Sequence, residues 1–85
     1  MKSFTYVIKD ETGIHARPAG VLSKLAKKFS SEIMIEKDKK AVNATRLMML
    51  MGLGIKCGDT VTVTVSGDDE EKAFDEVFSF FKENL

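Results

Sequence analysis

The one histidine of the chain, His15, lies in the run Gly13–Gly20, which reads GIHARPAG. An imidazole nitrogen is a nucleophile that can accept a phosphoryl group, and the guanidinium of Arg17 can bind phosphate oxygens. Directly after the histidine, residues 16–29 have the apolar spacing of an amphipathic helix. The first backbone N–H groups of a helix are unpaired and attract anions such as phosphate. The run therefore predicts phosphoryl transfer onto the histidine itself.

A lone histidine is more often structural or merely exposed than functional, so the position of His15 has to be considered. It is predicted to be the N-cap of the helix, where Ser, Thr, Asp and Asn are preferred and His is not. A poor capping residue at a cap position favours a chemical role over a role in helix stability. After transfer, the backbone N–H groups of Ala16 and Arg17 can donate to phosphate oxygens, whereas Pro18 has no N–H to offer.

Composition narrows the class of protein. Thirteen Lys and Arg balance thirteen Asp and Glu, which argues against a nucleic-acid binder. The cluster Lys24, Lys27 and Lys28 on the expected first helix would steer an acidic partner to the side that carries His15. The chain shows no phosphate-binding loop, metal-ligand spacing or serine–histidine–acid set, so neither a metal nor a cofactor is expected. A single cysteine, and no stretch typical of a signal peptide or membrane span, favour a cytoplasmic protein without membrane insertion.

Hydrophobic periodicity predicts four strands, at residues 4–8, 33–35, 41–42 and 60–65, and three helices. The second helix is expected from Arg46 to about Leu53 with Thr45 as its N-cap, and the spacing of Asp68 and Glu71 predicts a capping box before the last helix. The order β-α-β-β-α-β-α predicts an α+β fold: one domain over residues 1–85, with an antiparallel four-stranded sheet covered on one face by the helices. The expected helical core positions are Leu22, Leu25, Ala26, Phe29, Phe74, Val77, Phe78 and Phe81.

Five consecutive apolar residues begin at Leu47. On a helix they point in all directions, so they cannot all face one core. We assign Leu50 and Leu53 to the core, and Leu47, Met48 and Met51 to an outward contact patch, because methionine adapts to varied partner surfaces. The simpler alternative is that most of the run is core and the rest is incidental exposure.

The run at residues 13–19 resembles the active-site signature of HPr, the histidine-containing phosphocarrier of the bacterial sugar phosphotransferase system. The similarity extends over essentially the whole chain, including Ser31–Ile33, the end of the Met-rich helix and the strand that runs to Gly67. It implies an open-faced β-sandwich whose histidine accepts a phosphoryl group on Nδ1 from phosphorylated Enzyme I. The group then passes to the IIA domain of a sugar permease. A monomeric, stoichiometric carrier is implied rather than an enzyme.

The same resemblance places six residues on the face that docks these partners: Gly20, Lys24, Lys27, Leu47, Met48 and Met51. One position departs from the family. In low-GC Gram-positive members a regulatory serine opens the second helix and is phosphorylated by an ATP-dependent kinase, whereas this chain has Arg46 there. An alternative function is a regulatory interaction module that acts through the Met-rich helix and does not need the chemistry of His15.

Overall fold

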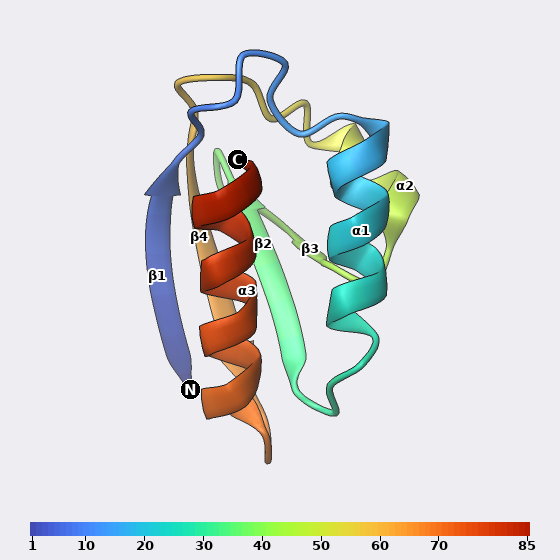
Figure 1. Cartoon of the computed structure of the whole chain (residues 1–85), viewed down its shortest axis with the longest axis vertical. Helices are drawn as coiled ribbons and strands as arrows, with labels where there is room; N and C mark the ends of the chain where they lie inside the picture. Colours follow the sequence, from blue (N-terminus) through green and yellow to red (C-terminus); the bar gives the residue numbers. More distant parts are fainter.

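The computed structural model describes all residues from Met1 to Leu85, and it folds as a sheet with helices on one face (Figure 1). The elements, in chain order, are β1 (Lys2–Val7), α1 (Ala16–Ala26), β2 (Glu32–Lys37), β3 (Lys40–Asn43), α2 (Leu47–Gly52), β4 (Thr60–Ser66) and α3 (Glu70–Asn84). All neighbouring strands are antiparallel, and their spatial order is β1-β4-β2-β3. The predicted α+β open-faced sandwich and its element order are confirmed. No helix has the length and apolar character needed to cross a membrane.

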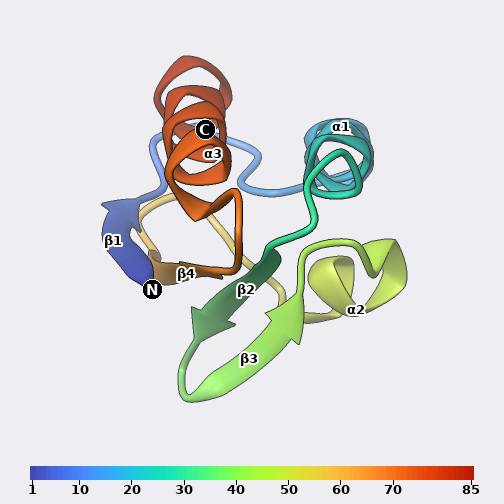
Figure 2. The same ribbon diagram turned by 90° about the horizontal axis from the view of Figure 1, so that it is seen from below.

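The central strand β4 shows why the sheet has one covered face. Its sequence alternates threonine with Val61, Val63 and Val65, and all three valines are fully buried. Side chains of a strand alternate between the two faces, so the valines lie under the helices and the threonines line the open face. The register places Phe4 opposite Val63 on one side and Ile35 opposite Val63 on the other. Figure 2 shows α1 and α3 above the same side of the sheet.

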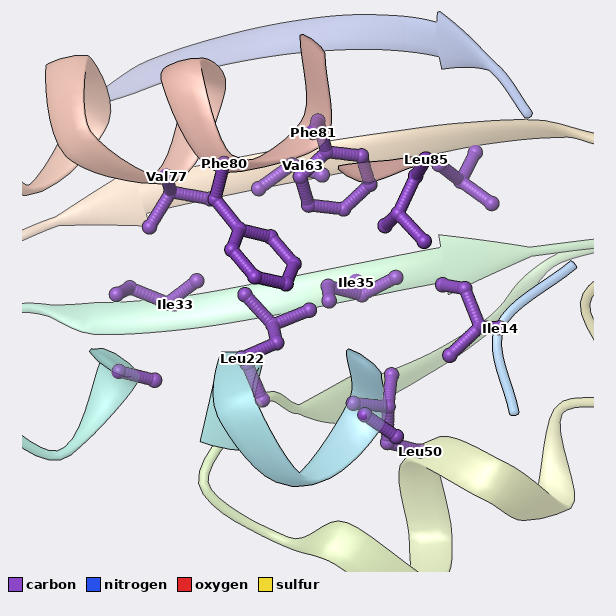
Figure 3. Close-up of a cluster of buried hydrophobic side chains, with 14 of the residues drawn as sticks. Ile14, Leu22, Ile33, Ile35, Leu50, Val63, Val77, Phe80, Phe81 and Leu85 are labelled. Atoms are coloured by element: carbon purple, nitrogen blue, oxygen red, sulfur yellow. The ribbon is translucent and has the colours of Figure 1, made fainter. Parts of the chain in front are cut away.

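The core lies between the sheet and the helices. Figure 3 shows Phe80 and Phe81 of α3 and Leu22 of α1 directed toward Ile35 and Val63 of the sheet. Phe4 adds edge-to-face contacts with three rings of α3, at centroid distances of 4.9 to 5.5 Å. Burying side chains of this size stabilises a fold by about 1.5–3 kcal/mol each. The buried apolar residues that belong to helices are Ala19, Leu22, Ala26, Leu50, Ala73, Val77, Phe80 and Phe81.

Helix α1 ends earlier than the sequence predicts. We expected it to reach Phe29, but the last helical residue is Ala26. The chain after Ala26 forms a tighter turn. The N–H of Lys28 donates to the carbonyl of Leu25 at 3.1 Å, and the N–H of Phe29 donates to the carbonyl of Ala26 at 3.4 Å. These are contacts to the third preceding residue, as is common where a helix ends. Phe29 still packs against the core as predicted, because this tight turn keeps it on the covered side.

The predicted cap of α2 is wrong. The N-cap is Arg46, whose side chain makes no capping bond. The hydroxyl of Thr45 instead donates to Oδ1 of Asn43 at 2.7 Å, and its backbone N–H donates to the same oxygen at 2.9 Å. An asparagine that bonds to the backbone two residues later forms a local turn, and this turn competes with capping by the threonine.

The predicted capping box of α3 is also wrong. The N-cap is Asp69, and the helix begins at Glu70. The carboxylate of Asp69 accepts bonds from the backbone N–H groups of Ser30 and Ser31 at 3.0 and 2.9 Å, and also from the hydroxyl of Ser31. It therefore joins the β4–α3 loop to the α1–β2 loop rather than capping its own helix.

Candidate functional site

His15 is the N-cap of α1, as predicted, with φ −113° and ψ −175°. Its carbonyl accepts the N–H of Ala19 at 3.0 Å, which closes the first helical turn. Its imidazole makes no capping bond and is exposed. The N–H groups of Ala16 and Arg17 have no acceptor within the protein, since they belong to the open first turn. An accessible nucleophile thus stands beside two free backbone donors.

The segment before the histidine is anchored on both sides. The N–H of Gly13 donates to the carbonyl of Asp10 at 2.9 Å, and the N–H of Ile14 donates to the carbonyl of Ile55 at 3.1 Å. The side chain of Ile14 is buried and points into the core, as Figure 3 shows. Since Ile14 points inward and the imidazole of His15 is exposed, core packing sets the position of the reactive residue.

Two surface hollows lie along α1; Arg17 lines both of them, and His15 lines one. We call the first the histidine hollow; it is lined by Asp10, His15, Arg17, Pro18, Val21, Phe80 and Asn84. We call the second the cationic groove; it lies between α1 and α2 and is lined by Arg17, Gly20, Val21, Ser23, Lys24, Lys27 and Leu47. The ion pairs of the protein, Met1 with Glu70 and Lys37 with Asp59, involve none of these cations. Their charge is therefore available to an anionic ligand or partner.

Four of the six residues predicted for the docking face line this groove: Gly20, Lys24, Lys27 and Leu47. Gly20 has open space at its α-carbon, and Leu47, Met48 and Met51 are all exposed. Leu50 is fully buried and Leu53 packs against the core, so the division of the apolar run was correctly predicted. Met49 is also exposed, at 56%, and was not predicted to be part of the outward patch. No local signal indicated this exposure, because Met49 lies four residues before the core residue Leu53 and so on the same helix face.

Five residues that line the histidine hollow were not predicted as site residues: Asp10, Pro18, Val21, Phe80 and Asn84. Asp10 is far from α3 in sequence, so no local pattern indicates that the two meet. The hydroxyl and the backbone N–H of Thr12 donate to Oδ1 of Asp10 and hold the pKa of that carboxyl below its usual range. The imidazole of His15 therefore shares its hollow with one anion and one cation.

The fold and the site define a small α+β protein that presents one nucleophilic histidine at an open helix start. The family model described as "PTS HPr component phosphorylation site" matches residues 2–83. The chain therefore belongs to the HPr family, the phosphocarriers of the phosphotransferase system.

The similarity to individual members extends over most of the chain. This chain is 44% identical over 75 residues to the HPr-like protein Crh of Halalkalibacterium halodurans, and the match covers 88% of this chain and 89% of that protein. A solved Mycoplasma histidine-containing phosphocarrier protein superposes with a TM-score of 0.93 at 36% identity, covering 96% of this chain and 93% of the other. The HPr dimer of Thermoanaerobacter tengcongensis gives a TM-score of 0.77 at 44% identity, covering 98% and 95% of the two chains.

Proposed function

We propose that this protein carries a phosphoryl group on His15 in the cytoplasm, taking it from phosphorylated Enzyme I and giving it to the IIA domain of a sugar permease. The observation that supports this most is the exposed, unbonded imidazole at the N-cap of α1, beside the free N–H groups of Ala16 and Arg17. The protein is a stoichiometric carrier rather than an enzyme, because each phosphoryl group resides on its own side chain.

The chemistry needs few groups. As the bond between phosphorus and its donor atom on Enzyme I breaks, a bond forms between phosphorus and the ring nitrogen of His15, Nδ1 in the family. The guanidinium of Arg17 and the two backbone N–H groups hold the phosphoryl oxygens during transfer. No metal or cofactor is required, since phosphoryl transfer between imidazoles depends mainly on positioning and charge stabilisation.

We further propose that the six residues named above form the docking face for both partners. Gly20, Lys24 and Lys27 belong to α1, and the apolar side chains Leu47, Met48 and Met51 belong to α2. The apolar residues would supply contact area, and the unpaired lysines would guide an acidic surface to the site. Because Arg17 lines the same groove, docking would place a partner's reactive group beside His15.

The test is phosphorylation by Enzyme I and phosphoenolpyruvate, followed by transfer to a panel of IIA domains. The wild-type protein should gain one acid-labile phosphate, and His15→Ala should gain none while keeping the same circular dichroism spectrum. Equal labelling of the two proteins would show that the acceptor is another residue. Labelling without onward transfer to any IIA domain would contradict the proposed transfer from His15 to a sugar permease.

A second candidate function is a regulatory interaction module. The exposure of Met48 and Met49 supports it, as does the similarity to an HPr-like protein Crh. Arg46 has no hydroxyl, so phosphorylation at the start of α2 cannot control this module. A partner whose capture depends on Met48 and Met51 but ignores phosphorylation of His15 would support the regulatory function over the carrier.

We propose that residues 1–85 act as one domain and as a monomer. The exposed face needed for transient docking supports a monomer, while the dimeric relative makes self-association the competing outcome. Sedimentation at several protein concentrations separates the two, since a dimer would increase with concentration. A stable dimer that still exchanges phosphoryl groups would contradict the monomer alone.

A further inference from the structure

Asp10 is held more firmly than a surface loop residue requires. Its backbone N–H donates to the main-chain oxygen of Leu85 at 2.8 Å, and its own carbonyl accepts the N–H of Gly13 at 2.9 Å. Its side-chain Oδ1 accepts the N–H of Thr12 at 2.9 Å and the hydroxyl of Thr12 at 2.7 Å. Only Oδ2 has no partner in the protein. The carboxylate is therefore fixed in place with one oxygen free.

The place where Asp10 is fixed is the histidine hollow. Of the side chains that line this hollow, Asp10 carries the only negative charge, and Arg17 is the only permanent cation. The two form no ion pair, so neither charge neutralises the other directly. The bonds from Thr12 keep the pKa of Asp10 low, and it is ionised at neutral pH. A phosphoryl group on His15 would thus share this hollow with one negative and one positive charge.

We propose that the Asp10 carboxylate makes the phosphoryl group on His15 easier to release, and so raises its transfer potential. This rests on the proposed carrier function and adds a residue to it. Asp10 is a positioning residue in this role, since it acts on the phosphoryl group through charge and forms no bond to it. Arg17 favours acceptance of the group, while Asp10 favours its departure.

Two electrostatic effects act in the same direction. The carboxylate repels the phosphoryl dianion, which destabilises the phosphorylated state. It also attracts a proton to the free nitrogen of the phosphorylated ring. When the phosphorus–nitrogen bond breaks, the electron pair remains on the ring nitrogen and the protonated ring leaves as neutral imidazole. Phosphorus gains a bond to the acceptor histidine, or to the oxygen of water in hydrolysis, which then loses a proton.

The test uses chemical phosphorylation, so that it does not depend on Enzyme I. Phosphoramidate transfers its phosphoryl group to accessible histidines, and 31P NMR then follows hydrolysis of the phosphohistidine at pH 7. Asp10→Asn should hydrolyse about three- to tenfold more slowly than the wild type at low ionic strength, and the difference should shrink with added salt. The equilibrium with Enzyme I should shift toward the phosphorylated carrier by a similar factor.

Two controls separate charge from structure. Glu11→Gln makes the same charge change at the next residue, which is exposed and lines neither hollow, and it should change the hydrolysis rate less than twofold. Thr12→Val removes the hydroxyl that holds Asp10 but keeps the carboxylate, so it should remain closer to the wild type than Asp10→Asn. Equal slowing by Glu11→Gln, or hydrolysis of Asp10→Asn at the wild-type rate, would overturn the role of Asp10. Failure of Enzyme I to phosphorylate the protein would instead contradict the carrier function.

Discussion

Gly13 lies against the backbone of Ile55 with no room for a side chain. A methyl group on Gly13 would come within 2.4 Å of the carbonyl oxygen of Ile55 and within 2.7 Å of the α-carbon of Lys56. That same carbonyl accepts the N–H of Ile14. Gly13 also has a φ of +68°, a backbone angle that residues other than glycine rarely adopt. Close packing of these two loops therefore fixes the segment that leads into His15.

Gly13→Ala should lower the free energy of unfolding by about 1–3 kcal/mol, because backbone atoms must move and the positive φ becomes strained. It should also slow phosphorylation by Enzyme I, since the displaced residue is only two positions before His15. Urea denaturation and initial labelling rates measure the two effects.

Gly20→Ala is the matched control for Gly13→Ala. Nothing lies within 4 Å of a methyl group at this helical position, so the free energy of unfolding should rise by about 0.5–1 kcal/mol. If both variants unfolded at the wild-type urea concentration, the contact between Gly13 and Ile55 would not constrain the loop.

The hydrogen bonds of Asp69 should make the stability of the folded protein depend on pH in the acidic range. Bonds from the hydroxyl of Ser31 and from the backbone N–H groups of Ser30 and Ser31 lower the pKa of Asp69 in the folded protein. A carboxyl with a lowered pKa stabilises the fold above its unfolded pKa of about 3.9, and this stabilisation is lost as pH falls through the folded value. The wild type should therefore lose stability below about pH 4. Asp69→Asn should melt at a lower temperature at pH 7 and lose less stability on acidification.

Asp75→Asn is the control for Asp69, because Asp75 is an exposed residue of the same helix. Its melting temperature should follow the wild type from pH 7 to pH 2. The Asp69 variant should keep part of the acid dependence, because hydrogen bonds also lower the pKa values of Asp10, Asp59 and Glu70. A pH profile of Asp69→Asn that matched the wild type would show that the serine bonds carry no pH-dependent stability.

The features that sequence reasoning predicted correctly depend on neighbours along the chain. The alternation of β4 reports which side chains face the core, and the spacing along α1 and α3 reports which helix faces do. His15 could be placed at a helix start because Pro18 and the apolar spacing that follows are local signals. The split between Leu50 and Met48 could be predicted because a single helix cannot bury all its faces.

The features that were missed depend on residues far apart in sequence. The carboxylate of Asp69 binds Ser30 and Ser31, which are 39 and 38 residues away, so no local pattern separates this contact from a capping box. Asp10 and Asn84 share a hollow only because the end of α3 packs beside the β1–α1 loop. The motif predicted the position of His15 at the helix start, whereas only the fold shows that Asp10 lines the same hollow.

Substitutions of core residues and of docking residues in α2 should have different effects: the first should lower stability, and the second should weaken binding to Enzyme I. Leu50→Ala should lower the free energy of unfolding by about 2–5 kcal/mol, because Leu50 is fully buried. Met48→Ala should change it by less than about 0.5 kcal/mol, because Met48 is 78% exposed, yet weaken binding to Enzyme I several-fold. Denaturation and calorimetric titration give the two quantities. Binding unchanged by Met48→Ala would exclude Met48 from the docking face.

Arg17 should contribute to the transfer step itself. Its guanidinium lines both hollows, has no acidic partner, and can bind two phosphoryl oxygens at once, which a lysine ammonium cannot. Arg17→Lys should therefore lower the rate of phosphoryl transfer at saturating Enzyme I by about 10- to 100-fold, since one bidentate charge contact is lost. Rapid-quench labelling measures this rate.

Lys28→Gln is the control for Arg17→Lys. It removes an exposed charge of the neighbouring turn that lines neither hollow, and this variant should accept the phosphoryl group at the wild-type rate. If Arg17→Lys raised only the Enzyme I concentration needed for half-maximal labelling, Arg17 would act in docking rather than in holding the phosphoryl group.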